Sequence, residues 1–119
     1  MREKRKFIRF NISLKTSYIL RREPKVEKTG ITKDVSAGGL QLLTEEKLNV
    51  GDKLELKFFI PEALNPAHLS GIVLWSKMVS TGIKPSYSAG IEFIDIEEDN
   101  KNTFLKFLCN LMYRKIGKQ

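Results

Sequence analysis

The chain has 119 residues, a length that predicts one domain built around one hydrophobic core. Its hydrophobic content of 41% is that of an ordinary globular protein and excludes a disordered tail. The net charge is +7, but the first 22 residues hold eight basic groups and one acid, and the charges of the rest cancel. A uniformly basic, histone-like surface is therefore excluded. The pattern describes a neutral body with a cationic N-terminal arm.

No apolar run approaches the roughly 20 residues that span a bilayer, and the basic N-terminus is not followed by the apolar stretch of a secretory signal. The single cysteine, Cys109, allows no internal disulfide and no all-cysteine metal site. These features predict a cytoplasmic protein without a membrane span.

Residues 1–10 show no periodicity except in charge and predict a flexible arm. After them, apolar and polar residues alternate in short runs, the pattern of half-buried strands, and proline, glycine or other turn residues separate the runs. Six strands are predicted, at residues 12–20, 26–34, 40–44, 54–60, 68–79 and 87–94. Gly30 lies inside the second of them and predicts a bulge or bend.

From Glu97 onward, apolar residues recur at spacings of three and four, which predicts an amphipathic helix. Acids near its start and bases near its end suit the helix dipole. Six strands followed by one helix predict an all-β core, a six-stranded antiparallel β-barrel with a C-terminal α-helix packed on it or plugging one end. We expect a single domain over 1–119, with the arm at 1–10, the barrel at 11–95 and the helix at 97–117.

Groups suited to catalysis or metal binding are scarce. The only histidine, His68, opens a predicted strand and is interpreted as a solvated surface residue. Cys109 lies among the apolar residues of the predicted helix and is interpreted as a packing residue. No Cys/His set has zinc spacing, and no glycine-rich phosphate loop precedes a helix. The sequence predicts a protein that is not an enzyme and has no metal or cofactor.

Two short motifs remain. Arg5 and Arg9 stand four residues apart in the arm, and residues 34–39 (DVSAGG) end one predicted strand and lead into the next. Taken singly, the first is compatible with a solubilising basic tail and the second with a hairpin turn. Together, in this order and ahead of four more strands and a helix, they resemble the signature of the PilZ domain family, R-x-x-x-R followed by [D/N]-x-S-x-x-G. The resemblance covers essentially the whole chain, including residues 73–75 (VLW) and 90–93 (GIEF).

The resemblance implies a six-stranded barrel that binds cyclic di-GMP, a bacterial second messenger. It assigns the grip on the nucleotide to two arm arginines and the hold on one guanine to three barrel residues. These site residues are Arg5 and Arg9 in the arm and Asp34, Ser36 and Gly39 in the barrel, with Lys4, Lys6 and Gly38 as further candidates. Within the family, the residue before the first arginine influences whether one nucleotide or a stacked pair binds, and here both remain open.

The residue types suit this ligand. An arginine fork binds a phosphate or guanine O6/N7 bidentately and stacks on rings. In an extended segment Arg5 and Arg9 lie about 13 Å apart, a separation that suits the two ends of a compact dinucleotide. The Asp34 carboxylate can accept from guanine N1–H and N2–H, and two adjacent glycines allow close backbone approach. We expect the arm to close over the nucleotide from a disordered state. Phe7 and Ile8 are expected to anchor it on the barrel, in preference to the alternative in which Phe7 stacks on a base.

Two other classes of protein are weighed against this hypothesis. A PilZ-like adaptor that binds no nucleotide is disfavoured because all five signature positions are present. A small β-barrel nucleic-acid-binding module is compatible with a basic arm, but the neutral body and the core-like positions of the aromatic residues argue against it. These aromatic residues are Phe58, Phe59, Trp75 and Phe93. A stand-alone receptor implies an unidentified downstream protein partner, and either a monomer or a ligand-linked homodimer fits.

Overall fold

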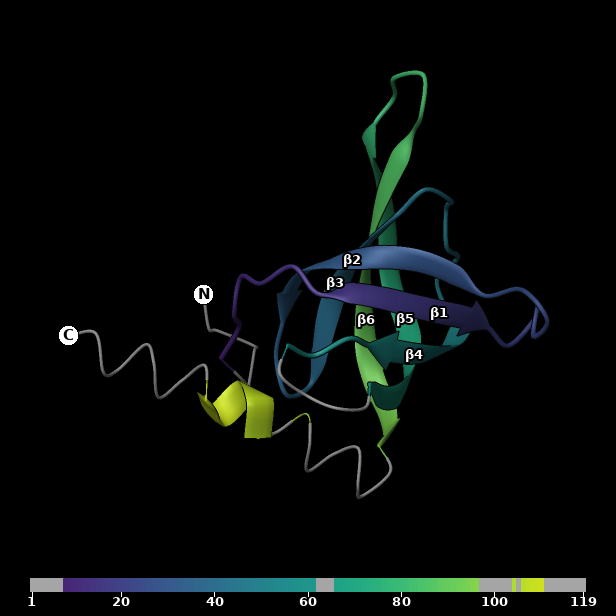
Figure 1. Ribbon diagram of the computed structural model, residues 1–119. Coiled ribbons are helices and arrows are strands. Elements are labelled where there is room, and N and C mark those ends of the chain that lie inside the picture. Colours follow the sequence, from purple (N-terminus) through teal and green to yellow (C-terminus); the bar gives the residue numbers. More distant parts are fainter. Residues whose placement is uncertain (1–7, 62–65, 97–103, 105, 111–119) are drawn as a thin grey trace, which may run out of the picture.

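The computed structural model, which describes residues 8–61, 66–96, 104 and 106–110, is a closed barrel of six antiparallel strands (Figure 1). Around the barrel the order is β1-β2-β3-β6-β5-β4. The strands are β1 (Lys15–Leu20), β2 (Lys28–Val35), β3 (Gly39–Thr44), β4 (Lys53–Phe58), β5 (Ala67–Ser80) and β6 (Ser86–Ile96). A short helix at the C-terminal end completes the predicted architecture, which is confirmed.

The first strand begins three residues later than predicted because a side chain replaces part of the ladder. The buried Thr32 hydroxyl accepts a hydrogen bond from the Leu14 N–H at 2.7 Å and donates one to the Ile12 carbonyl at 2.7 Å. Residues 12–14 therefore stay attached to β2 without regular strand pairing. At the other side, β4 ends at Phe58 rather than at residue 60, although the Phe59 N–H still bonds to the Lys15 carbonyl.

The bulge predicted at Gly30 is wrong in position. Gly30 pairs regularly with Thr16, and the register shift in β2 falls between Thr32 and Asp34, so Lys33 is the extra residue. Gly30 has a different role, because a Cβ there would lie 2.8 Å from the Leu43 carbonyl oxygen. The missing side chain lets β3 approach β2 closely.

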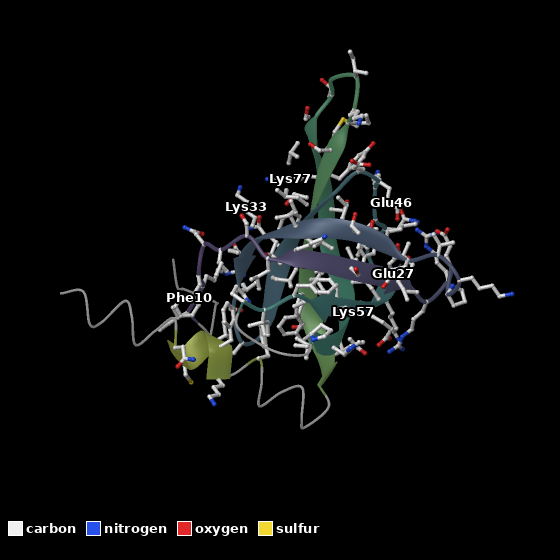
Figure 2. All side chains as sticks on the ribbon, viewed as in Figure 1. Phe10, Glu27, Lys33, Glu46, Lys57 and Lys77 are labelled. Atoms are coloured by element: carbon white, nitrogen blue, oxygen red, sulfur yellow. The ribbon has the colours of Figure 1, made fainter. Side chains whose placement is uncertain are left out.

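Alternate residues of every strand fill the barrel. In β1 the side chains of Tyr18 and Leu20 point inward, and in β4 those of Leu56 and Phe58 do so, each at most 1% exposed. This alternation is the period-two pattern of the sequence expressed as a core. Figure 2 shows side chains filling the space inside the ring of strands.

The C-terminal helix closes one end of the barrel. Its described residues, 104 and 106–110, lie within the predicted helix, whose other residues fall outside the described part. The Phe104 ring stacks on that of Phe58 at 5.6 Å and meets that of Phe93 edge-on at 5.4 Å. Phe104 and Leu108, one helical turn apart, are buried, whereas Cys109 is exposed. The interpretation of Cys109 as a packing residue is wrong, because one further residue turns its side chain about 100° away from the buried stripe.

The hairpin of β5 and β6 extends beyond the barrel and stands above it in Figure 1. Trp75, in β5, is 37% exposed, and Phe59, just after β4, is 44% exposed. The expectation that all four strand aromatics occupy core positions is therefore wrong for these two. Among the described residues, no helix is long and apolar enough to cross a membrane.

Candidate functional site

The turn between β2 and β3 is closed by one serine. The Ser36 N–H donates to the Gly39 carbonyl at 2.8 Å, and the Ser36 hydroxyl donates to the same oxygen at 3.1 Å. The hydroxyl also accepts from the N–H groups of Gly38 and Gly39, both at 3.2 Å. One donor and two acceptor sites are all that a serine hydroxyl has. Ser36 therefore uses its hydrogen-bonding capacity to hold the shape of the turn.

Gly39 is required by the packing of β3 against β6. A Cβ at this position would lie 2.2 Å from the Ile91 carbonyl oxygen, a backbone atom that cannot rotate away. On the same side, the Phe93 N–H bonds to the Gly38 carbonyl at 3.0 Å. The glycine thus keeps the turn against its neighbouring strand, a role that the sequence pattern alone did not reveal.

Gly39→Ala should lower the free energy of unfolding by about 1–3 kcal/mol, because the added methyl group forces β3 and β6 apart. Urea denaturation measures the change. Gly82→Ala is the matched control, since the nearest atom to its Cβ would be the Ser80 hydroxyl at 4.0 Å. Equal stabilities of the two variants would contradict this role of Gly39.

The bulge at Lys33 places the Asp34 carboxylate on the outside of the barrel. Thr32 pairs with Leu42, whose side chain points inward, and without the extra residue Asp34 would follow Thr32 to the inner face. Instead Asp34 pairs with Gln41 on the outer face, and Val35 takes the inward position opposite Leu40. Bulges commonly redirect a side chain beside a functional site. This bulge is the structural device that sequence analysis missed.

The end of the arm is joined to the same place. Phe10 and Val35 exchange two backbone hydrogen bonds, at 2.8 and 2.9 Å, and the Phe10 side chain packs against the core. Ile8, by contrast, is 51% exposed, so the expected anchoring by this residue is wrong, and Phe7 lies outside the described residues. Phe10 is the anchor, and an aromatic residue directly after Arg9 was the available signal.

The backbone pairing of Phe10 with Val35 brings the two sequence motifs into contact. The Arg9 Nη1 atom lies 3.2 Å from the Asp34 Oδ1 atom, across 25 residues of chain. The Arg9 side chain is 35% exposed and that of Asp34 is 12% exposed, so the pair is partly buried and Arg9 is its more accessible member. The structure therefore gathers Arg9, Asp34 and the turn at 36–39. Arg5, Lys4 and Lys6 lie outside the described residues.

A second polar cluster, around Glu46, attaches the loop between β3 and β4 to β1 and β2. The Lys28 ammonium group bonds both Glu46 carboxylate oxygens at 2.7 and 2.8 Å, and these hydrogen bonds raise the pKa of Lys28. Burial, followed by the charge of Glu46, raises the pKa of the Tyr18 phenol above its ordinary value. Figure 2 shows Glu46 on the loop between β3 and β4. No group of three metal-ligating side chains occurs in the part of the chain that is described, and His68 is exposed.

Comparison with known proteins agrees with this geometry. The model of the PilZ domain matches residues 3–109. The structure of the MrkH–c-di-GMP complex from K. pneumonia superposes with a TM-score of 0.77 at 17% identity, covering 98% of this chain and 56% of that one. The PilZ domain with c-di-GMP of YcgR from Escherichia coli has a TM-score of 0.70 at 13% identity, covering 98% and 97%.

A third similar structure is the Bacillus subtilis inhibitor of motility MotI/DgrA, with a TM-score of 0.70 at 16% identity, covering 95% of this chain and 53% of that one. At these identities the likeness establishes the fold. The chain spans about half the length of MotI and MrkH. A search of curated proteins returns no match.

Proposed function

Because this chain belongs to the PilZ domain family, we propose that it is a receptor for cyclic di-GMP, which binds between the arm and the turn at residues 34–39. The neighbouring MrkH and YcgR structures contain this nucleotide. The observation that carries the proposal is the contact between Arg9 and Asp34, which unites the two halves of the signature on the outer surface of the barrel.

In the proposed mechanism, the ligand replaces the ion pair. The Arg9–Asp34 pair is partly buried, so a ligand that separates the two groups must supply new partners for both charges. In the complex, the Asp34 carboxylate accepts hydrogen bonds from guanine N1–H and N2–H, while Arg9 turns to a phosphate or to guanine O6 and N7. Hydrogen bonds to charged groups contribute about 1.5–3 kcal/mol each. The ligand thus provides a partner for each charge of the ion pair, and the pair holds both side chains at the site before the ligand binds.

In this proposal, the part of the arm that closes over the nucleotide lies N-terminal to Phe10. Phe10 is held by its two backbone hydrogen bonds and its packing, so we propose that ligand-linked ordering concerns the part of the arm that carries Lys4, Arg5 and Lys6. Ordering that segment costs conformational entropy, and we expect a micromolar or somewhat lower Kd. The ordered arm then presents a new surface to a downstream protein, without any chemical step.

The turn residues act by position. Since the Ser36 hydroxyl is fully engaged within the turn, we propose that Ser36 and Gly39 hold the strand end that carries Asp34. Gly38 has no Cβ, which would allow a base to approach the backbone of the turn closely.

Isothermal titration with cyclic di-GMP tests the proposal. We expect the wild type to bind and Arg9→Ala to bind at least about tenfold more weakly, because a charged hydrogen-bond donor is lost. Arg21→Ala is the control, since Arg21 also forms an ion pair with a carboxylate, that of Glu55 on a different part of the barrel. Absence of binding by the wild type at micromolar ligand would refute the receptor function. Displacement of the nucleotide by single-stranded DNA at physiological salt would favour the nucleic-acid-binding alternative.

A further inference from the structure

The part of the β5–β6 hairpin that projects from the barrel has an open edge (Figure 1). Strand β5 pairs with β4 as far as Ile72, and the Val73 N–H and C=O still bond to Asp52 and Gly51 at 2.9 and 2.8 Å. Beyond that point, residues 74–80 pair with β6 alone within the described residues. The other edge of this segment therefore presents its backbone groups without a partner strand.

Apolar side chains accompany this edge. Leu74 and Met78 are each 52% exposed, and Val79 is 49% exposed. Trp75 is held in place because its indole occupies the space where a Cβ of Gly90 would lie. An exposed apolar strand edge is a template for pairing with another chain. A two-stranded ribbon is only marginally stable in water, so this hairpin gains from a third strand.

Two bulges limit the length of the pairing surface. The register of β5 against β6 shifts between Val73 and Trp75 and again between Met78 and Ser80. The regular stretch between the bulges, Trp75–Met78, is short, and the twist at each end restricts indefinite edge-to-edge association. The occupant is therefore a short extended segment rather than a growing sheet.

The charge of the hairpin indicates the chemistry of the occupant. No acidic residue occurs between Glu62 and Glu92, whereas Lys77 and Lys84 do. The Lys77 ammonium group lies 5.7 Å from the centre of the Trp75 ring, and Figure 2 shows Lys77 beside the projecting hairpin. Two copies paired antiparallel about Lys77 would place their Lys77 side chains opposite each other, and like charges directly opposite on adjacent strands are destabilising. A strand with a carboxylate opposite Lys77 is complementary.

The open backbone edge disfavours a lipid surface as the occupant. Met78, Val79 and Ile83 are exposed toward the tip of the hairpin. Lipid tails, however, offer no hydrogen-bond partner to the unpaired backbone groups of β5, whereas an added strand does.

We propose that the open edge of β5 at residues 74–80 binds an extended segment of a partner protein as an added strand, with an acidic residue of that segment against Lys77 and apolar residues against Leu74 and Met78. Backbone hydrogen bonds supply affinity in this mode, and the side chains supply selectivity. The interaction does not depend on the proposed nucleotide function.

The test uses three synthetic peptides cut to the length of the open edge. One alternates valine with glutamate, the second alternates valine with lysine, and the third is the glutamate peptide N-methylated at alternate amides. Trp75 is the only tryptophan of the chain, so its fluorescence reports binding at this site directly. We expect the glutamate peptide to shift the emission, the lysine peptide to bind at least about threefold more weakly, and the N-methylated peptide not to bind.

Lys77→Glu should reverse the preference between the glutamate and lysine peptides, whereas Lys25→Glu, an exposed lysine in the loop before β2, should leave it unchanged. Equal binding of the N-methylated peptide would overturn strand addition. Absence of any shift with the glutamate peptide would also overturn the proposal. So would concentration-dependent dimerisation that Lys77→Glu weakens, or binding to anionic phospholipid vesicles in place of the peptides.

Discussion

Asp34→Asn should weaken the binding of cyclic di-GMP by about 10- to 100-fold or more while the barrel remains folded. Asparagine has nearly the same shape, but it replaces one carboxylate oxygen by an NH2 group and removes the charge. The proposed pair of guanine N–H donors then faces one acceptor and one donor. Each hydrogen bond to a charged group contributes about 1.5–3 kcal/mol, so the loss is large even if Arg9 still reaches a phosphate.

Asp52→Asn is a closely matched control for this experiment. The Asp34 and Asp52 side chains are both 12% exposed, and both form an ion pair with an arginine, Arg9 and Arg22 respectively. Isothermal titration of both variants with cyclic di-GMP and with its adenine counterpart separates recognition from general stability. We expect Asp52→Asn to bind as the wild type does. Similar affinity losses in the two variants, or unchanged affinity in Asp34→Asn, would contradict the guanine-binding role.

Phe104→Ala should lower the free energy of unfolding by about 3–5 kcal/mol, the largest stability effect we expect. The side chain is 1% exposed and joins the C-terminal helix to the barrel through the rings of Phe58 and Phe93. Its removal leaves a cavity at the closed end, and deleting a buried phenylalanine ring typically costs this amount. Urea denaturation followed by circular dichroism measures the change.

Lys106→Ala serves as the control on the same helix, because Lys106 is exposed and alanine is at least as good a helix former. This variant should stay within about 0.5 kcal/mol of the wild type. A loss below about 1 kcal/mol for Phe104→Ala would mean that the helix contributes little to closing the barrel.

The candidate site was only partly predictable. Each of the two motifs is a short contiguous stretch of sequence, so Arg9, Asp34 and the turn at 36–39 could be named as candidates. The structural roles of the turn residues could not be predicted. The Ser36 hydroxyl makes all its hydrogen bonds within its own turn. Gly39 is needed because a Cβ at this position would collide with the Ile91 carbonyl oxygen. Both facts depend on where neighbouring backbone atoms lie. The unpaired edge of β5 could not be predicted for the same reason, because the residue pattern of a strand does not show which strands pair with it.

Local alternation, helical spacing and the distribution of charge were enough to predict six strands, a C-terminal helix and the cationic arm, because each is a property of consecutive residues. Tertiary structure alone decided which face Asp34 occupies. One extra residue at Lys33 shifts the register of β2 against β3 and turns the carboxylate outward. It also decided that Arg9 meets Asp34, through the pairing of Phe10 with Val35. Register and pairing are set by segments far apart along the chain, so neither is written in the pattern of a single strand.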